Sequence, residues 1–149
     1  MPARKRTERP TTTALHGGVK PYVRKKGEKY MNKKQLAHFH TILSAGRRGL
    51  LDELSRTVNQ MRDETTLHPD PNDRATRETD ISLELRSRDR ESKLVKKIDE
   101  ALERIELGDY GYCDVCGVEI GIERLEARPT AELCIDCKTL DEIRERQMA

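Results

Sequence analysis

The chain has 149 residues, of which 34% are hydrophobic and 38% charged, with no Trp and a single Phe. This is too little apolar material for a broad core, although it suffices for narrow seams between helices. No apolar run approaches the roughly 20 residues of a membrane span, and the first thirty residues lack the apolar stretch of a signal peptide, so we expect a cytoplasmic protein without membrane contact. The net charge of +2 conceals a gradient: residues 1–34 carry +9, residues 35–107 carry −2 and residues 108–149 carry −5.

Residues 1–31 form a basic segment that is rich in Pro, Gly, Thr and Lys and has no hydrophobic periodicity. Such a composition predicts a mostly irregular arm. We predict that the arm is a solvated tail. The alternatives are that it packs on the body through Val19, Tyr22 and Tyr30, or that it contacts an acidic partner.

Residues 32–107 contain two stretches of helical periodicity, which predict a mainly α protein built on a long antiparallel coiled-coil hairpin. Asn32 is a good N-cap for the first helix, and Gly108 is expected to end the second. With about 35 residues in each arm, the hairpin is on the order of 50 Å long. The predicted seam residues are Leu36, Phe39, Leu43, Leu50, Leu54, Val58 and Met61 in the first arm, and Ile81, Leu85, Leu94, Ile98, Leu102 and Ile105 in the second.

Two glycines interrupt the first seam, in the segment "SAGRRGLL". Gly46 falls on the seam and Gly49 lies beside it. Each Gly costs a helix roughly 1 kcal/mol relative to Ala. We therefore expect a locally loose or bent helix at this point and not a break.

The tip of the hairpin is predicted at about residues 67–76, "LHPDPNDRAT". Asp70 can cap the second helix with Pro71 as its first residue, and Asp73 then lies where a carboxylate interacts favourably with the helix dipole. These residues fit a well-made turn and a functional tip equally well.

Four cysteines follow in the pattern C-x2-C-x17-C-x2-C, formed by Cys113, Cys116, Cys134 and Cys137. In a reducing compartment two close pairs indicate metal binding and not disulfides. Two CxxC turns supply the four sulfurs of a tetrahedral Zn²⁺ site, and four protein ligands leave no coordination position open for a substrate. We predict one structural Zn²⁺ ion within a zinc-binding head, residues 108–149, that includes a C-terminal helix; a redox-active CxxC pair is the alternative.

Zinc fingers of this spacing often bind DNA, so the charge of the head is informative. Residues 108–149 carry −5, and four thiolates around Zn²⁺ contribute about two further negative charges. DNA binding depends on phosphate neutralisation by Lys and Arg. We therefore do not expect sequence-specific DNA binding by the head.

Three stretches carry a resemblance to a known family: "PDP.DRA" at the turn, "SLELR.RDRE.KL.KKI" on the second arm, and the zinc segment from Gly111 onward. From about Pro21 to Met148 the chain resembles the DksA/TraR family, bacterial transcription factors that act on RNA polymerase without binding DNA. The zinc segment matches the family signature at Cys113, Cys116, Ile120, Arg124, Pro129, Cys134 and Cys137.

The resemblance implies a coiled-coil finger that enters the secondary channel of RNA polymerase and carries acidic residues toward its active site. The implied tip residues are Asp70, Asp73 and Ala75. It also implies a site for the alarmone ppGpp at the interface with the polymerase, where three cations suit phosphate groups. This site maps onto Lys97, Arg128 and Lys138, with Leu94 beside them.

We accordingly predict a monomeric, non-enzymatic transcription regulator that destabilises promoter complexes, represses ribosomal RNA promoters, activates some others and is potentiated by ppGpp in the stringent response. Two alternatives stay open. One is a Gre-like transcript-cleavage factor, whose tip carboxylates would hold a second catalytic Mg²⁺. The other is a DNA-binding zinc-finger regulator in which the basic arm supplies the affinity.

Overall fold

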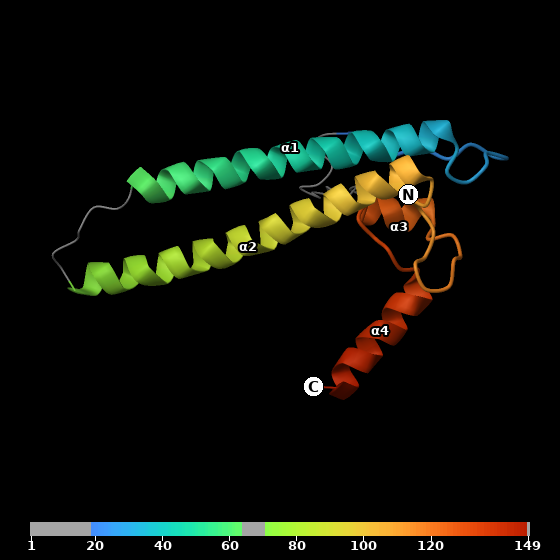
Figure 1. Cartoon of the computed structure of the whole chain (residues 1–149). Helices are drawn as coiled ribbons and strands as arrows, with labels where there is room; N and C mark the ends of the chain where they lie inside the picture. The colour runs from blue at the N-terminus through green and yellow to red at the C-terminus, as the bar shows by residue number, and fades with distance from the viewer. Residues whose placement is uncertain (1–18, 64–70, 149) are drawn as a thin grey trace, which may run out of the picture.

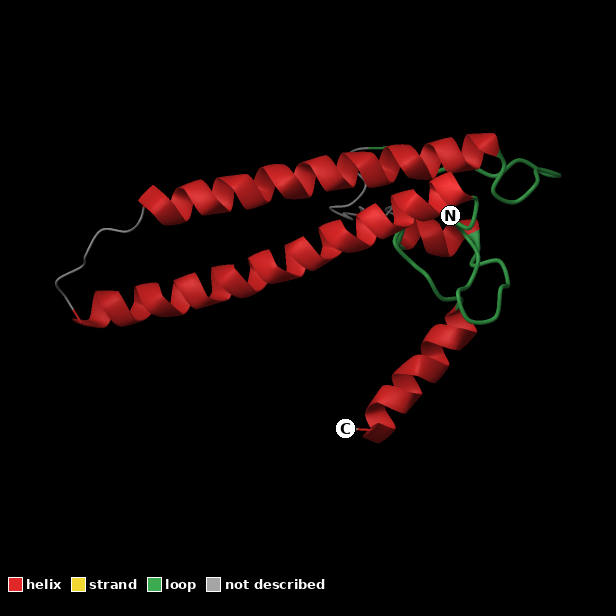
Figure 2. Cartoon of the chain, viewed as in Figure 1, coloured by secondary structure: helices red, strands yellow, loops and turns green. Residues whose placement is uncertain are grey.

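The computed structural model of the chain describes residues 19–63 and 71–148 and contains four helices (Figure 1). Helix α1 spans Lys33–Asp63, α2 spans Pro71–Leu107, α3 spans Ile122–Ala127 and α4 spans Ile135–Met148. The two long helices run antiparallel, α3 lies at their root, and α4 projects away from it. Between the helices the described chain is loop, apart from one isolated β-bridge between Tyr112 and Glu119 (Figure 2). The predicted mainly α fold, a long helical hairpin with a small head and a C-terminal helix, is confirmed.

The start of α1 is fixed by side chains that satisfy its free backbone groups. Asn32 Oδ1 accepts a hydrogen bond from the backbone N–H of Gln35 at 2.9 Å, as predicted for the N-cap. The Gln35 side chain in turn accepts from the backbone N–H of Met31 at 2.7 Å, a close variant of the capping box. Because Gln35 is fully buried, this reciprocal pair anchors the helix start within the head.

Both ends of α2 also lie where the sequence predicts them. The helix begins at Pro71 with Asp73 in its first turn, as predicted; Asp70 lies outside the described residues. At the other end Gly108 has a φ of +81°. The N–H of Gly108 donates to the carbonyl of Ile105 at 3.3 Å, and that of Asp109 to the carbonyl of Arg104 at 2.9 Å. This is a Schellman motif, which ends the helix and turns the chain toward the cysteines.

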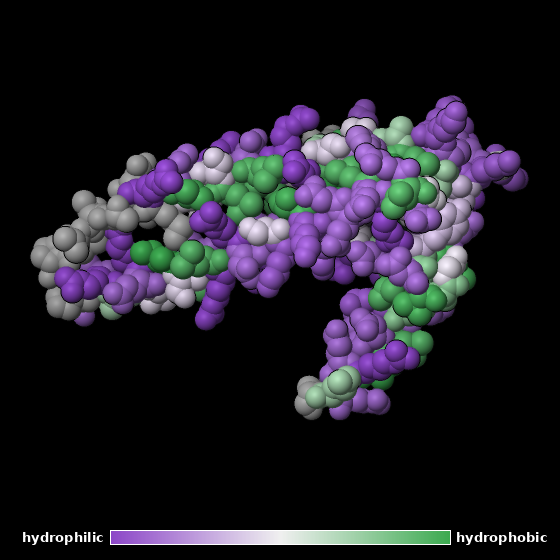
Figure 3. All heavy atoms as spheres, viewed as in Figure 1, coloured by the Kyte–Doolittle hydropathy of each residue, from purple (hydrophilic) through white to green (hydrophobic). Residues whose placement is uncertain are grey.

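The apolar core lies at the root of the hairpin, where α1, α2 and the head meet. Its most buried apolar members, each at most 1% exposed, are Phe39, Ile42, Leu43, Ile98, Tyr110 and Leu125. Burying each such side chain stabilises the fold by about 1.5–3 kcal/mol. The Tyr110 hydroxyl donates to the carbonyl of Pro129 at 2.7 Å, and burial raises the pKa of this tyrosine, so it remains a neutral donor. Figure 3 shows hydrophilic side chains over most of the outer surface and apolar ones in the strip between the long helices.

Residues 19–31 form an N-terminal strap that packs across the root of the hairpin. Val19, Tyr22 and Tyr30 contact the core cluster. The Tyr22 backbone N–H donates to the Glu126 carboxylate at 2.8 Å, and the Tyr30 hydroxyl donates to the Gly111 carbonyl at 2.7 Å. The predicted solvated tail is therefore wrong for this segment, and the alternative that it packs on the body through Val19, Tyr22 and Tyr30 is confirmed. Tyrosine rings gain by burial while their polar groups keep partners. Residues 1–18 lie outside the described part of the chain.

The seam of α2 differs from the prediction in its distal half. Leu85 is 49% exposed. The predicted Leu94 is partly buried against the core. A set of side chains that are at least partly buried recurs at alternating intervals of three and four: Ile81, Glu84, Arg88, Glu91, Val95, Ile98, Leu102 and Ile105. The apolar periodicity does not identify these positions, because three consecutive members of the set, Glu84, Arg88 and Glu91, are charged. In α1 the helix continues through Gly46 and Gly49, so the expectation of no break is confirmed.

Replacement of Gly49 by Ala is predicted to stabilise the protein. Gly49 is helical and exposed, and a Cβ built on it meets nothing within 4 Å. The variant should gain about 0.5–1 kcal/mol of unfolding free energy, which raises the melting temperature by roughly 1–4 °C. Thermal unfolding of the zinc-loaded protein, followed by circular dichroism, measures the change.

Gly108→Ala is the matched control. Its Cβ would also meet open space, but the backbone has a φ of +81°. The left-handed conformation costs a non-glycine residue about 1–2 kcal/mol, so this variant should be less stable than the parent. A lower melting temperature for Gly49→Ala would contradict the assignment of Gly49 to an unstrained helical position.

Candidate metal centre and cationic pocket

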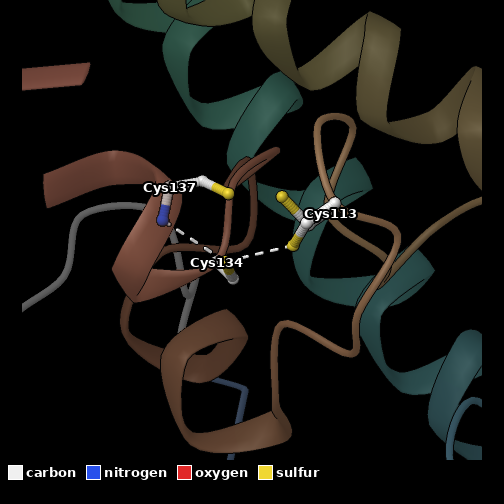
Figure 4. A group of neighbouring side chains, drawn as sticks. Cys113, Cys134 and Cys137 are labelled. Carbon is white, nitrogen blue, oxygen red and sulfur yellow. Dashed lines mark hydrogen bonds between the residues drawn. The ribbon is translucent and has the colours of Figure 1, made fainter. Parts of the chain in front are cut away.

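The four predicted cysteines lie together at the head. The four sulfur atoms all lie within 4.8 Å of one another, and those of Cys116 and Cys134 are 3.6 Å apart. Sulfurs at the usual Zn–S distance of about 2.3 Å on the corners of a tetrahedron would be about 3.8 Å apart. Figure 4 shows the side chains of Cys113, Cys134 and Cys137 turned toward one another. The cluster therefore fits a single tetrahedral Zn²⁺ ion.

A tight turn presents the first cysteine pair. The backbone N–H of Cys113 donates to the Val118 carbonyl at 2.8 Å, and the N–H of Gly117 donates back to the Cys113 carbonyl at 3.0 Å. Gly117 has a φ of +74°, which glycine adopts without strain. The turn brings both sulfurs of the pair to the same side of the chain.

The second cysteine pair lies at the start of α4. Cys134 precedes the helix, and its sulfur accepts a hydrogen bond from the backbone N–H of Cys137 at 3.4 Å. The sulfur thus occupies the place of an N-cap acceptor. Cys137 lies in the first turn of α4, so the helix itself orients the fourth ligand.

The acid–base chemistry of the sulfurs also suits a cation. Burial raises the pKa of the Cys113 thiol, but backbone hydrogen bonds from Cys116, Cys134 and Val115 outweigh it and bring the pKa to about 6. Hydrogen bonds with the thiols of Cys134 and Cys116 raise the pKa of Cys137 to about 12. A divalent cation at their centre would stabilise the thiolate form of all four. Because all four positions would be protein ligands, the role of the ion would be structural.

Two arginines connect the cysteine turns to the rest of the molecule. Arg104, in the last turns of α2, donates to the Tyr112 carbonyl at 2.7 Å and pairs with the Asp114 carboxylate at 3.1 Å. Arg124 of α3 donates to the Leu133 carbonyl at 3.1 Å. The zinc turns are thereby held to both the hairpin and α3.

A cationic pocket of about 400 Å³ lies where α2 meets the head. The structure brings together here all four residues that the resemblance assigned to a phosphate ligand: Leu94, Lys97, Arg128 and Lys138. They come from two parts of the chain, α2 and the head, and approach one another only because the core and the cysteine cluster fix the angle between those parts.

Sequence reasoning missed other residues of this pocket. Arg124, Thr130 and Glu132 also line it, so four cations face one carboxylate. Lys138 lies 3.8 Å from Asp141 and 4.0 Å from Glu142 on α4, which moderates its charge. Of the added residues only Arg124 had a sequence signal, as part of the zinc-segment signature; the others become apparent only once the chain is folded.

The predicted tip residues lie at the far end of the hairpin from the head. Asp73 and Ala75 are exposed in the first turns of α2, and Asp73 lines a hollow on the helix surface with Thr76, Arg77 and Asp80. Asp70 falls outside the described residues. Asp73 and Ala75, at the start of α2, and the cationic pocket, where α2 meets the head, are therefore separate surfaces.

Long paired helices that end in a four-cysteine zinc finger define a class of helical-hairpin zinc proteins. Residues 35–105 match the family described as "DnaK suppressor protein DksA, N-terminal domain", and residues 108–142 match "Prokaryotic dksA/traR C4-type zinc finger". The chain belongs to the DksA family of transcription factors. It is thus classed as a regulator and not as an enzyme, in agreement with the prediction.

Individual relatives match this sequence over most of its length. The "RNA polymerase-binding transcription factor DksA" of Escherichia coli strain K12 is 64% identical over 89% of this chain and 87% of its own length. The protein of the same name from Haemophilus influenzae is 62% identical over 89% of this chain and 91% of its own. The solved structure of transcription factor DksA2 from Pseudomonas aeruginosa has a TM-score of 0.72 and 42% identity, covering 78% of this chain and 90% of its own.

The metal centre leads to a direct prediction. The protein purified without chelators should contain one Zn²⁺ per chain. Cys116→Ser should lower the zinc content and loosen the head while leaving α1 and α2 helical, since Phe39 and Leu43 of α1 and Ile98 of α2 belong to an apolar cluster that contains no cysteine. Elemental analysis and circular dichroism measure the two effects.

Val115→Ser provides the control, because Val115 lies between the first two cysteines and is 73% exposed. This variant should keep its zinc. Zinc well below one equivalent in the parent protein would contradict the assignment.

Proposed function

We propose that this chain binds RNA polymerase directly and regulates the initiation of transcription. The observation that carries the proposal is the high identity to a relative named an RNA polymerase-binding transcription factor, which extends over both the hairpin and the head. The finer steps below rest on the family resemblance and on the chemistry of the residues in this chain.

The head docks on the rim of the polymerase and the hairpin enters the secondary channel. Helices of 31 and 37 residues are about 45–55 Å long, which lets a narrow rod reach a site that the head cannot approach. Asp70, Asp73 and Ala75 are the tip residues in this proposal. The carboxylates of Asp70 and Asp73 come near the region that holds the catalytic Mg²⁺ and alter the mobile elements around it.

The cationic pocket is the proposed site for ppGpp, at the interface with the polymerase. Lys97, Arg128 and Lys138 contact phosphate oxygens, for which charge-assisted hydrogen bonds are the strong interactions. Leu94 supplies apolar contact beside them. In this proposal the polymerase supplies the remaining contacts to the ligand.

Regulation requires that the protein bind one state of the polymerase more tightly than another, because equal affinity for both would shift nothing. We propose that it favours states in which promoter complexes are unstable. Ribosomal RNA promoters are then repressed, some others are activated, and ppGpp strengthens both effects.

The three parts of the chain divide this work. Residues 1–31 are the basic, mostly irregular arm, of which the described residues 19–31 pack on the root of the hairpin. Residues 32–107 are the hairpin that carries the tip, and residues 108–149 are the zinc head. In this proposal the protein acts as a monomer in the cytoplasm. No described helix is long and apolar enough to cross a membrane.

In vitro transcription from a ribosomal RNA promoter tests the function as a whole. The protein and ppGpp are added separately and together; the protein should reduce transcription alone and more strongly with ppGpp. A protein that leaves transcription unchanged under all conditions contradicts the proposal.

The cation cluster provides a residue-level prediction. Changing Lys97, Arg128 or Lys138 to Ala should weaken the response to ppGpp by roughly tenfold or more, since a hydrogen bond to a charged group is worth about 1.5–3 kcal/mol. Polymerase binding without ppGpp should change less. Lys93→Ala is the control, because Lys93 is exposed on α2 outside the pocket. Full responses from all three pocket variants would show that this site is wrong.

The variant Asp73→Asn tests whether the tip has a regulatory function or is only a structural turn. The change keeps the shape of the side chain and removes a helix-start charge worth only about 0.3–1 kcal/mol. The variant should unfold within a few degrees of the parent and still bind polymerase, yet lose transcriptional control. Asp89→Asn is the control, since Asp89 is an exposed aspartate of α2 outside the hollow that Asp73 lines. Normal regulation by the Asp73→Asn variant would show that this segment is only a structural turn.

A further inference from the structure

The segment that leads into α1 is strongly basic. Residues 19–34 contain seven Lys and Arg side chains and one carboxylate, that of Glu28, so their net charge is +6. All seven cations are exposed. None of them forms an ion pair with another residue of the described chain. Ion pairs within the protein therefore do not compensate this positive charge, whereas residues 108–149 of the head carry −5.

A hydrogen-bonded turn presents part of this charge to solvent. The backbone N–H of Glu28 donates to the carbonyl of Lys25 at 3.3 Å, and Gly27 has a φ of +86°. Lys25 and Lys26 therefore lie in a β-turn that uses the conformational freedom of glycine. A Cβ built on Gly27 would meet nothing within 4 Å, so the turn stands clear of the rest of the chain. Figure 1 shows this loop beyond the start of α1.

The one carboxylate of the segment is used to hold the turn in place. Glu28 accepts a hydrogen bond from the Tyr22 hydroxyl and another from the Gln35 side-chain amide, the latter at 3.4 Å. Gln35 is fully buried and lies in the first turn of α1. The turn and its two lysines are thereby fixed to the same end of the molecule as the start of α1.

The first turn of α1 carries cations where helix stability favours anions. Lys33 and Lys34 are the first two residues of the helix, and the first turn contains no acidic residue. Positive charge at this end opposes the helix macrodipole and lowers the stability of the helix. These lysines therefore do not contribute to folding through their charge, and their positive charge adds to that of the strap.

The composition of the segment favours a phosphate backbone over a protein surface as its partner. Six of its seven cations are lysine, a residue type that is depleted in protein interfaces but neutralises phosphates well. Among its large apolar side chains only Val23 is exposed, at 81%, so the segment lacks the apolar centre of a protein interface.

The aromatic rings of the segment distinguish a duplex from a single strand. Tyr22 and Tyr30 are packed against the core, and their hydroxyls donate to Glu28 and to the Gly111 carbonyl. Single-strand binding relies on exposed rings on which bases stack. Duplex DNA, whose charge lies on its outer backbone, needs no such ring.

We propose that this end of the molecule binds the phosphate backbone of duplex DNA without reading its sequence. The surface, which we call the cationic end, comprises Arg24, Lys25, Lys26 and Lys29 of the strap and Lys33 and Lys34 of α1. It gives a weak, salt-dependent affinity for DNA to a chain whose acidic head contributes none. It is separate from the cationic pocket and from Asp73.

Fluorescence anisotropy of a labelled short duplex, titrated with the full-length, zinc-loaded protein, tests the cationic end. The protein should bind at low salt, equally to two duplexes of unrelated sequence and more weakly to a single strand. The double variant Lys25→Gln/Lys26→Gln should bind roughly tenfold more weakly at low salt, and its plot of log affinity against log salt should be less steep by about 2, since each phosphate contact contributes about 0.9 to that slope.

Lys93→Gln/Lys96→Gln is the matched control, because it removes the same charge from exposed positions of α2. This variant should bind DNA as the parent does. The variant Lys33→Gln/Lys34→Gln adds a second readout: it should lose DNA affinity and unfold at a slightly higher temperature, since the charges that oppose the helix dipole are gone. A lower melting temperature would show that the two lysines serve the fold instead.

No binding of the parent protein to duplex DNA at low salt would overturn the proposal, as would an equal loss of affinity in the α2 control or tighter binding to the single strand. Strap variants that lose affinity for polymerase while the parent does not bind DNA would overturn it in favour of an acidic protein surface. Because the DNA titration contains no polymerase, its failure would leave the proposed function standing.

Discussion

Phe39 and Leu43 of α1 pack with Ile98 of α2 and with Tyr110 and Leu125 of the head, and the rest of the molecule depends on this contact. A chain with one Phe and 38% charged residues has apolar material for one such cluster. Its position at the root of the hairpin lets it hold both long helices, the N-terminal strap and the head at the same time. A cluster at mid-rod would have stabilised the hairpin and left the head unattached.

The two proposed working surfaces depend on this root in different ways. The cationic pocket is built from α2 and the head, so both the core and the metal centre must be intact for Lys97, Arg128 and Lys138 to face one ligand. The tip lies beyond the last core residue, where helical hydrogen bonds replace tertiary packing. Substitutions at the root should therefore impair the pocket first, whereas the part of the hairpin beyond Leu50 of α1 and before Leu94 of α2 should tolerate change in its own seam.

Much of the fold could be predicted because the decisive signals are local. Asn32 caps α1 and Pro71 begins α2 through short-range chemistry, and the cysteine spacing defines a metal site before any fold is known. The strap was misjudged because the burial of Tyr22 and Tyr30 depends on surfaces distant in sequence. Similarly, Leu85 was placed in the seam by its hydrophobicity, although the helical phase set by Val95 and Ile98 directs charged residues inward.

The residues of the cationic pocket are also far apart in the sequence, and local patterns do not group them. Composition and spacing gave no reason to group Leu94 with Lys138, and only the family resemblance did so. The fold then added Arg124 and Glu132 as neighbours. Sites assembled from separate elements are read poorly from sequence, because the distances that matter are set by packing at the root.

The central claim, that the rod enters the polymerase tip first, is tested most directly by site-specific photo-crosslinking. A photoreactive amino acid replaces exposed Thr76 near the tip, and in a second protein it replaces exposed Glu103 near the head. The account predicts that position 76 crosslinks to polymerase residues lining the secondary channel close to the active centre, and that position 103 crosslinks nearer the channel entrance or not at all. Crosslinks from position 76 to the outer surface of the polymerase would contradict it.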